Sequence, residues 1–306
     1  FANGRGNVAQ FNYCTGVAVV PPGVLSISGL LPAGTAATHL VVTDVFNARV
    51  RLIRSPYDSW TSGLPWEPWN PSFYQVTTIA GTGTSGYASG RGDTAQFSAP
   101  GAVAVGPGGV IYVLERAPGN RVRQLRYIGG NPMDAANWHV SLLAGSSSGD
   151  SGYVNGAGAA ARFNDPRGLA VGPDGTVYVA DTYNHCIRKI TPGGAVTTLA
   201  GTNTAGYLDA TGSAARFNGP WSIAAGPDGY LYVADRYNNR IRRVSPSGVV
   251  TTVAGTGSSV LVDGPGNTAH FSDALGLAVS AGGDLYLAEA ECLRLIQRII
   301  DVGRPN

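Results

Sequence analysis

One thirteen-residue segment occurs twice in this chain. YVADTYNHCIRKI at residues 178–190 returns 54 residues later as YVADRYNNRIRRV at residues 232–244. An Ala-x-Phe sequence marks the same repeat along the whole chain, and its phenylalanines are Phe11, Phe97, Phe163, Phe217 and Phe271. These phenylalanines lie 86, 66, 54 and 54 residues apart. A period of this length is typical of repeat architectures. The chain therefore predicts five copies of one 54-residue unit, with insertions in the first two.

Each unit has the sequence pattern of four short strands. In residues 153–206 a polar, glycine-rich stretch comes first, and a Pro-Asp-Gly turn at 173–175 separates two apolar segments. Alternating and β-branched residues predict strands. The expected strands are 168–172, 176–181, 186–190 and 195–201. Four strands joined by tight turns form an antiparallel meander, which cannot bury both of its faces alone. Stacking such sheets around an axis covers those faces, so the repeat predicts a β-propeller.

The repeated residues resemble a known family. ARFNDPRGLAVGPDGTVYVAD followed by TYNHCIRKI and GGAVTTLAG looks like the NHL repeat. The resemblance is strongest in units three and four and implies a propeller, commonly with six blades. Five units are present here. We therefore expect an all-β fold, an NHL-type β-propeller of five blades with four antiparallel strands each, with a six-bladed ring as the alternative. Residues 1–306 would form one domain, with loop insertions at about 20–38, 55–75 and 127–139.

The number of predicted strands leaves the last blade incomplete. Units one to four each contain a fourth strand, at residues 76–81, 140–145, 196–201 and 250–255. Unit five stops after its third strand, which gives 19 of the 20 strands that five blades need. An open sheet edge can pair with another chain. The missing strand is expected from residues upstream of Phe1 or from a neighbouring molecule.

An acidic residue and an arginine recur at fixed places in the units. The predicted pairs are Asp44 with Arg51, Glu115 with Arg123, Asp181 with Arg188, Asp235 with Arg242, and Glu289 with Arg298. One interpretation is a ring of carboxylates that holds a metal or transfers protons. The favoured interpretation is an ion pair that fixes a turn to a strand in every blade, because catalysis needs one specialised constellation rather than five copies.

The sequence offers no catalytic constellation. The histidines, His39, His139, His185 and His270, stand in different contexts and do not converge at zinc-ligand spacing. One branch of the NHL family is a peptide-amidating lyase that uses metal-bound histidines, and no matching set is present. We therefore predict no catalytic residue, no metal ligand and no cofactor. A metal-dependent lyase or hydrolase of the propeller type remains an alternative.

Charge and hydropathy limit the partners. The net charge is +2, and no apolar run is long enough to span a membrane. The resemblance also covers NHL proteins that bind RNA through a basic face, but a charge this small does not favour nucleic acid. Charged residues make up only 13% of the chain, about half the usual share. This composition favours an extracellular or cell-surface protein.

One insertion is rich in aromatic residues and has no counterpart in the other units. Residues 55–75 contain four prolines and a group of aromatic residues, Tyr57, Trp60, Trp66, Trp69, Phe73 and Tyr74. Tryptophan and tyrosine are typical anchors of interfaces, and insertions in repeat proteins often lie on the binding face. The loop could instead fold back and cap the propeller. We expect a non-enzymatic scaffold that binds proteins, including copies of itself, and that could build an extracellular filament. A monomeric ligand- or glycan-binding propeller is the alternative.

Overall fold

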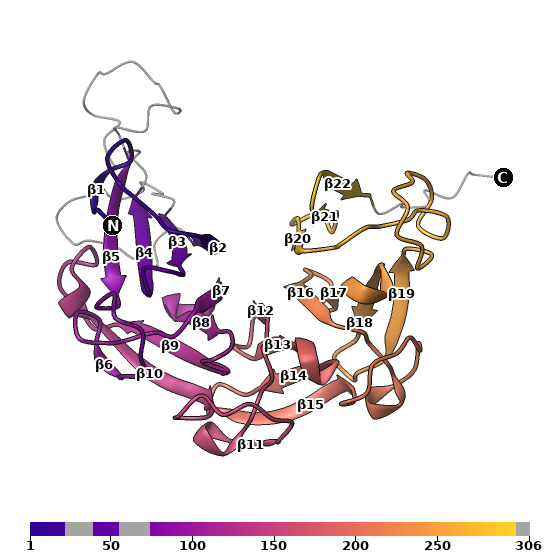
Figure 1. The fold of residues 1–306 in the computed structure, drawn as a ribbon, viewed down its shortest axis with the longest axis horizontal. Coiled ribbons are helices and arrows are strands. Elements are labelled where there is room, and N and C mark those ends of the chain that lie inside the picture. The colour runs from indigo at the N-terminus through magenta and orange to yellow at the C-terminus, as the bar shows by residue number, and fades with distance from the viewer. Residues whose placement is uncertain (22–38, 55–73, 298–306) are drawn as a thin grey trace. The chain divides into compact units, whose positions relative to one another are not determined.

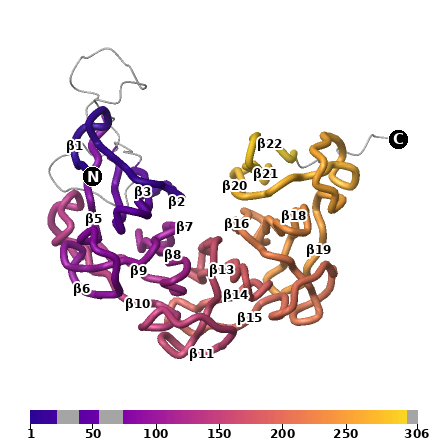
Figure 2. Tube along the Cα trace, viewed as in Figure 1, coloured from indigo at the N-terminus to yellow at the C-terminus, as the bar shows by residue number. Residues whose placement is uncertain are grey.

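The computed structural model describes residues 1–21, 39–54 and 74–297. Its fold is all-β, with five antiparallel sheets that are the blades of a β-propeller (Figure 1). The tube view follows the same succession of sheets along the chain, from blade 1 near the N-terminus to blade 5 (Figure 2). The predicted fold class is therefore confirmed.

The strands lie where the repeat predicts them. Blade 1 contains β1 (Gly4–Arg5), β2 (Cys14–Val20), β3 (His39–Asp44), β4 (Arg49–Arg54) and β5 (Gln75–Ala80). Blade 2 contains β6 (Gly90–Arg91), β7 (Pro100–Val105), β8 (Ile111–Glu115), β9 (Arg121–Tyr127) and β10 (Trp138–Gly145). Blade 3 contains β11 (Gly156–Ala157), β12 (Gly168–Val171), β13 (Val177–Asp181), β14 (Cys186–Ile190) and β15 (Ala195–Gly201).

Blades 4 and 5 contain fewer strands. Blade 4 contains β16 (Pro220–Ala225), β17 (Leu231–Asp235), β18 (Arg240–Val244) and β19 (Val250–Ala254). Blade 5 contains β20 (Gly276–Val279), β21 (Leu285–Ala288) and β22 (Leu293–Ile296). Within the described residues, its sheet is three-stranded, as the strand count predicts. Short 3-10 turns join the elements: η3 (Pro107–Gly109), η4 (Ala135–Asn137), η5 (Gly158–Ala160), η6 (Thr182–Asn184), η7 (Gly212–Ala214) and η8 (Arg236–Asn238).

Three blades contain a strand that the sequence did not predict. In blades 1 to 3 a two-residue strand pairs with the outside of the fourth strand, so that blade 2 has the order β6-β10-β9-β8-β7. In blade 2, Gly90 of β6 lies opposite Val140 of β10. These short strands come from the glycine-rich stretch that begins each unit. Two residues are too few to give a periodic signal, so the pairing is fixed by tertiary structure.

The chain divides into two compact units. The first comprises Phe1–Val177 with Ile190–Val196, and the second comprises Tyr178–Lys189 with Thr197–Asn306. The core of the first unit joins blades 1 and 2 through residues such as Val50, Ile79, Phe97 and Val113. The core of the second unit joins blades 4 and 5 in the same way, with Phe271 packed among Ile241, Ala254 and Leu287. The repeated phenylalanines Phe97 and Phe271 thus pack between neighbouring blades.

The third insertion, residues 127–139, closes over the first unit. Trp138 is fully buried in the core of that unit, and its indole N–H donates a hydrogen bond to the Pro132 carbonyl over 2.9 Å. The hydroxyl of Thr77 in blade 1 donates to the Met133 carbonyl over 3.0 Å. This insertion therefore stabilises the contact between blades 1 and 2.

Candidate interaction site

The repeated acid and arginine form a buried ion pair. In blade 4, Nη1 of Arg242 donates to Oδ2 of Asp235 over 2.7 Å, and neither side chain is exposed. The Asn238 amide also donates to Oδ2, over 2.8 Å. Blades 1 and 3 contain the same pair, with 2.9 Å between Arg51 and Asp44 and 2.7 Å between Arg188 and Asp181. These four side chains are also fully buried, so they have no access to a substrate in solution.

Each pair also holds the backbone on both sides of the repeated phenylalanine. In blade 4, the N–H of Asn218 donates to Oδ1 of Asp235 over 2.8 Å. Arg242 donates to the carbonyl of Arg216 over 3.0 Å, so both neighbours of Phe217 are fixed. We call this arrangement the Ala-x-Phe clamp. It fixes the segment whose phenylalanine packs against the preceding blade.

The clamp recurs in blades 1 and 2 with equivalent partners. In blade 2, the N–H of Ser98 donates to Glu115, and Arg123 donates to the Gln96 carbonyl over 3.1 Å. In blade 1, Asn12 and Gln10 occupy these places around Phe11. Because the carboxylate and the arginine together hold the Ala-x-Phe segment, an acidic residue and an arginine recur with it in the units.

A second repeated arginine lies two residues before the clamp arginine. Arg240 donates to the carbonyls of Asn238 and Thr256, over 2.9 and 2.5 Å, and its guanidinium lies 3.8 Å from the centre of the Tyr207 ring. Arg49 and Arg121 lie at the same distance from the rings of Phe1 and Tyr87. These arginines tie the turn before the third strand to the linker after the fourth.

Glu289 of blade 5 has an arginine partner that the sequence did not indicate. In the described part of the chain, Glu289 pairs with Arg294, whose Nη1 lies 3.5 Å from Oε2. Arg294 lies opposite Leu287 in its sheet, as Arg242 lies opposite Val233 in blade 4. The turn between β21 and β22 is short, so the equivalent arginine comes earlier than predicted. The predicted Arg298 lies outside the described residues.

Burial shifts the acidity of two clamp carboxylates. Burial raises the pKa of Glu115 to about 7, and the opposing effect of the guanidinium groups of Arg123 and Arg121 is smaller. Burial likewise raises the pKa of Asp235 to about 6, against the hydrogen bond from Asn238 and the charge of Arg242. Shifted carboxyl groups can mark catalytic sites. Here both carboxylates are fully buried and belong to a repeated structural clamp.

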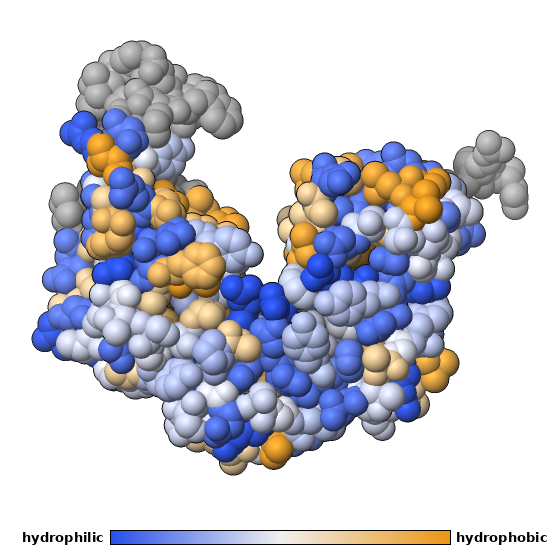
Figure 3. All heavy atoms as spheres, in the orientation of Figure 1, coloured by the Kyte–Doolittle hydropathy of each residue, from blue (hydrophilic) through white to orange (hydrophobic). Residues whose placement is uncertain are grey.

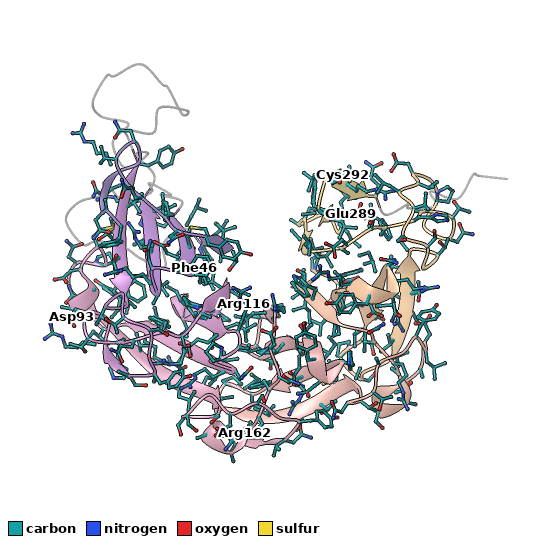
Figure 4. The ribbon with its side chains drawn as sticks, in the orientation of Figure 1. Phe46, Asp93, Arg116, Arg162, Glu289 and Cys292 are labelled. Carbon is teal, nitrogen blue, oxygen red and sulfur yellow. The ribbon has the colours of Figure 1, made fainter. Side chains whose placement is uncertain are left out.

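The remaining metal and redox candidates lie apart. Within the described ranges, no three His, Cys, Asp or Glu side chains come together as a metal site. Cys14, Cys186 and Cys292 are free thiols. Cys292 lies beside Glu289 at the β21–β22 turn, and its thiol donates to Oε2 of that carboxylate over 3.5 Å (Figure 4).

The predicted aromatic loop falls almost entirely outside the described residues. Tyr57, Trp60, Trp66, Trp69 and Phe73 lie in that part of the chain. Tyr74 immediately precedes β5, and its carbonyl accepts a hydrogen bond from Gly6 over 2.8 Å. The role of residues 55–75 as an interaction loop stays a prediction.

The structure shows apolar surface on the two end blades that the sequence did not indicate. Val17 in β2 is 65% exposed, whereas its counterparts Val103 and Ile223 are 7% and 4% exposed. The counterparts are defined by register, because Val17, Val103 and Ile223 lie opposite Val42, Val113 and Val233. In an internal blade, this side chain packs against the blade before it, as Val103 does in the core shared with blade 1.

The last blade exposes its opposite face. Tyr286 in β21 is 41% exposed, whereas its register counterparts Tyr112 and Tyr232 are 4% and 7% exposed. Leu293 and Leu295 in β22 are 72% and 50% exposed. The space-filling view shows apolar residues gathered on this blade and on the loop before it (Figure 3). These residues are recognised as uncovered only when each strand is compared with the equivalent strand of another blade.

Known proteins share the repeat and the fold. The NHL repeat model matches residues 163–190 and 217–244. The chain is 28% identical over 250 residues to SUPPRESSOR OF QUENCHING 1, a chloroplastic protein of Arabidopsis thaliana. This match covers 75% of this chain and 22% of that protein. It is 38% identical over 95 residues to NHL repeat-containing protein 2 of Bos taurus, covering 30% of this chain and 13% of that protein. The chain thus spans less than a quarter of the length of either relative.

A solved structure supports the fold alone. The streptogramin B lyase structure is 13% identical and has a TM-score of 0.50, covering 94% of this chain and 65% of that one. The repeated blades and the two matched segments make this chain an all-β propeller that contains NHL repeats. In these segments it is similar to NHL repeat-containing proteins. Among the described residues, no helix is long and apolar enough to cross a membrane.

Proposed function

We propose that this chain is a non-enzymatic interaction propeller that associates with copies of itself through its two end blades. The observation that carries the proposal is the exposure of apolar positions in blades 1 and 5 that are buried in blades 2 and 4. Val17 and Tyr286 are the clearest examples, because their register counterparts in blades 2 and 4 are at most 7% exposed. Exposed apolar patches of this kind mark interaction surfaces.

The two surfaces differ in kind and suit each other. Blade 1 presents the face that receives a preceding blade, and blade 5 presents the face that receives a following one. Contact between two different surfaces is heterologous, and such contacts build rings or open filaments. Val19, which is 57% exposed, extends the surface of blade 1. A blade 5 face docked on a blade 1 face would repeat the packing that joins blades within the chain.

The clamp supports a role without catalysis. All five acidic residues singled out in the sequence are buried, and those of blades 1 to 4 are fully buried. Their hydrogen bonds go to the Ala-x-Phe segments of the same chain. An enzyme of the lyase type would need a separate constellation open to solvent.

Light scattering on the full chain tests the proposal. We expect the molar mass, measured by size-exclusion chromatography with light scattering, to rise with concentration, and electron microscopy to show rings or filaments. Replacing both Val17 and Val19 with glutamate should abolish the larger species, and so should Tyr286→Glu. Ile128→Glu is the matched control, because Ile128 is 60% exposed but lies in the third insertion. A monomer at every concentration would overturn the proposal.

A further inference from the structure

The last blade contains an open slot beside its outer strand. A cavity of about 700 Å³ runs between β22 and the loop at 261–266. Leu293 and Leu295 line one wall, and Gly264 and Pro265 line the other. Both walls are thus formed by elements of the second unit.

The same place is filled in other blades. In blade 2 the fourth strand, β10, lies between β9 and the short strand β6. Val140 of β10 lies opposite Leu125 on one side and Gly90 on the other. In the repeat, β22 corresponds to β9 and Gly264 to Gly90, and both glycines have a positive φ, of 157° and 129°. The slot is therefore the position of a fourth strand.

The wall formed by residues 261–266 has a backbone N–H donor in position. In blade 2 the N–H of Gly92 donates to the Trp138 carbonyl over 2.8 Å, and in blade 4 the N–H of Gly212 donates to the Gly248 carbonyl over 2.9 Å. Gly266 is the equivalent residue of blade 5. Within the described residues, its N–H makes no hydrogen bond. A strand in the slot would supply the missing carbonyl.

The wall formed by β22 has an apolar residue in position. Leu293 pairs with Ala288 next to Arg294, as Ile241 pairs with Ala234 next to Arg242 in blade 4. Ile241 is fully buried and lies opposite Ala254 of the fourth strand, whereas Leu293 is 72% exposed. The register of blade 4 therefore places a small residue of the incoming strand opposite Leu293.

Asp263 gives the slot a preference for threonine. In blade 4 the equivalent Asp209 bonds to Arg242 over 2.6 Å and accepts from both the N–H and the hydroxyl of Thr252, over 2.9 and 3.2 Å. In blade 1, Asn3 takes this place, accepting from Arg51 and from the hydroxyl of Thr78. Asp263 already pairs with Arg294 over 2.6 Å, but its side chain is 94% exposed. Asp263 is thus held by Arg294, but within the described residues no threonine donates to it.

We propose that the slot binds an extended segment of another protein as the fourth strand of blade 5. The segment would be uncharged, with an aliphatic residue opposite Ile296, a threonine opposite Arg294 and an alanine opposite Leu293. This is the pattern of Val250, Thr252 and Ala254 in β19. Strand addition of this kind gains affinity from backbone hydrogen bonds and specificity from alternate side chains. The inference does not depend on the self-association proposed above.

A peptide copied from blade 4 tests the proposal directly. The probe is a fluorescein-labelled GVVTTVAGT peptide, the sequence of residues 248–256, titrated with the full chain and followed by anisotropy. We expect saturable binding and slower amide hydrogen exchange in β22. A peptide with valine in place of the second threonine should bind roughly tenfold more weakly, since it lacks the hydroxyl that Asp263 accepts. A scrambled peptide should not bind.

Variants of the chain test the residues that carry it. Asp263→Ala should weaken binding roughly tenfold and should no longer distinguish the threonine peptide from the valine peptide. Asp263→Asn, which copies Asn3 of blade 1, should recover most of the affinity. Asp284→Asn in the β20–β21 turn is the matched control and should bind as the unchanged chain does. Absence of binding by the folded chain, or equal affinity for all peptides, would overturn the proposal. Loss of self-association in Tyr286→Glu with intact peptide binding would separate the two surfaces.

Discussion

Arg242 donates to Asp235 over 2.7 Å, and both side chains are fully buried beneath the segment that contains Phe217. The same relationship recurs in other blades because it solves the same problem in each. The Ala-x-Phe segment is an irregular stretch whose backbone groups need partners when buried. The carboxylate accepts from its N–H and the guanidinium donates to its carbonyl, so one ion pair satisfies both.

Removing one partner of this pair should destabilise the fold strongly. Asp235→Ala removes the buried partner of Arg242 and the acceptor of Asn218 and Asn238, and leaves Arg242 paired only with the partly exposed Asp209. We expect a loss of roughly 3 kcal/mol of unfolding free energy, the lower end of the range for breaking a buried pair. Urea denaturation followed by circular dichroism measures the loss. Asp93→Ala is the control, because its ion pair with Arg91 is exposed and should be worth less than about 1 kcal/mol. Equal losses for the two variants would show that the clamp is not a buried pair.

The repeated phenylalanine should matter according to its burial. Phe217→Ala removes a fully buried ring and should cost roughly 3–5 kcal/mol. Phe11→Ala should cost less than half of that, since Phe11 is 38% exposed and no described blade precedes it. Thermal and urea unfolding of both variants make the comparison. A larger loss at Phe11 would mean that another surface covers blade 1 in solution, which self-association would explain.

The Glu115 carboxyl should make stability depend on pH. Its pKa is raised by burial from an ordinary value near 4.5 to about 7, so the folded state binds the proton more tightly than the unfolded state. The resulting stabilisation is complete below about pH 4.5 and is lost as the pH rises to about 7. Glu115→Gln should flatten the fall in unfolding free energy between pH 5 and 7.5, as measured by urea denaturation. If the variant and the unchanged chain show the same slope over this range, Glu115 does not titrate as described.

The sequence indicated the repeat correctly because every unit solves the same packing problem. The period-2 alternation around Val177–Asp181 and Leu231–Asp235 predicted strands, and the repeated acids and arginines predicted ion pairs. These are local signals, or signals that recur at a fixed spacing. Where the spacing changed, the repeat indicated the position less well: the turn after Glu289 is shorter than in the other blades, and Arg294 takes the clamp position, whereas the predicted Arg298 lies outside the described residues.

What the sequence determined by itself is the identity of the blade, and what the tertiary structure decided is which surfaces remain uncovered. Val17 and Val103 are the same residue in the same register, and sequence cannot say that one is 65% exposed and the other 7%. Asp263 and Asp209 likewise occupy equivalent positions, yet only Asp209 has a threonine from a fourth strand as its partner. Exposure depends on neighbours that are distant along the chain. A repeat therefore specifies its own fold locally, whereas the exposure of each blade's faces depends on the blades packed beside it.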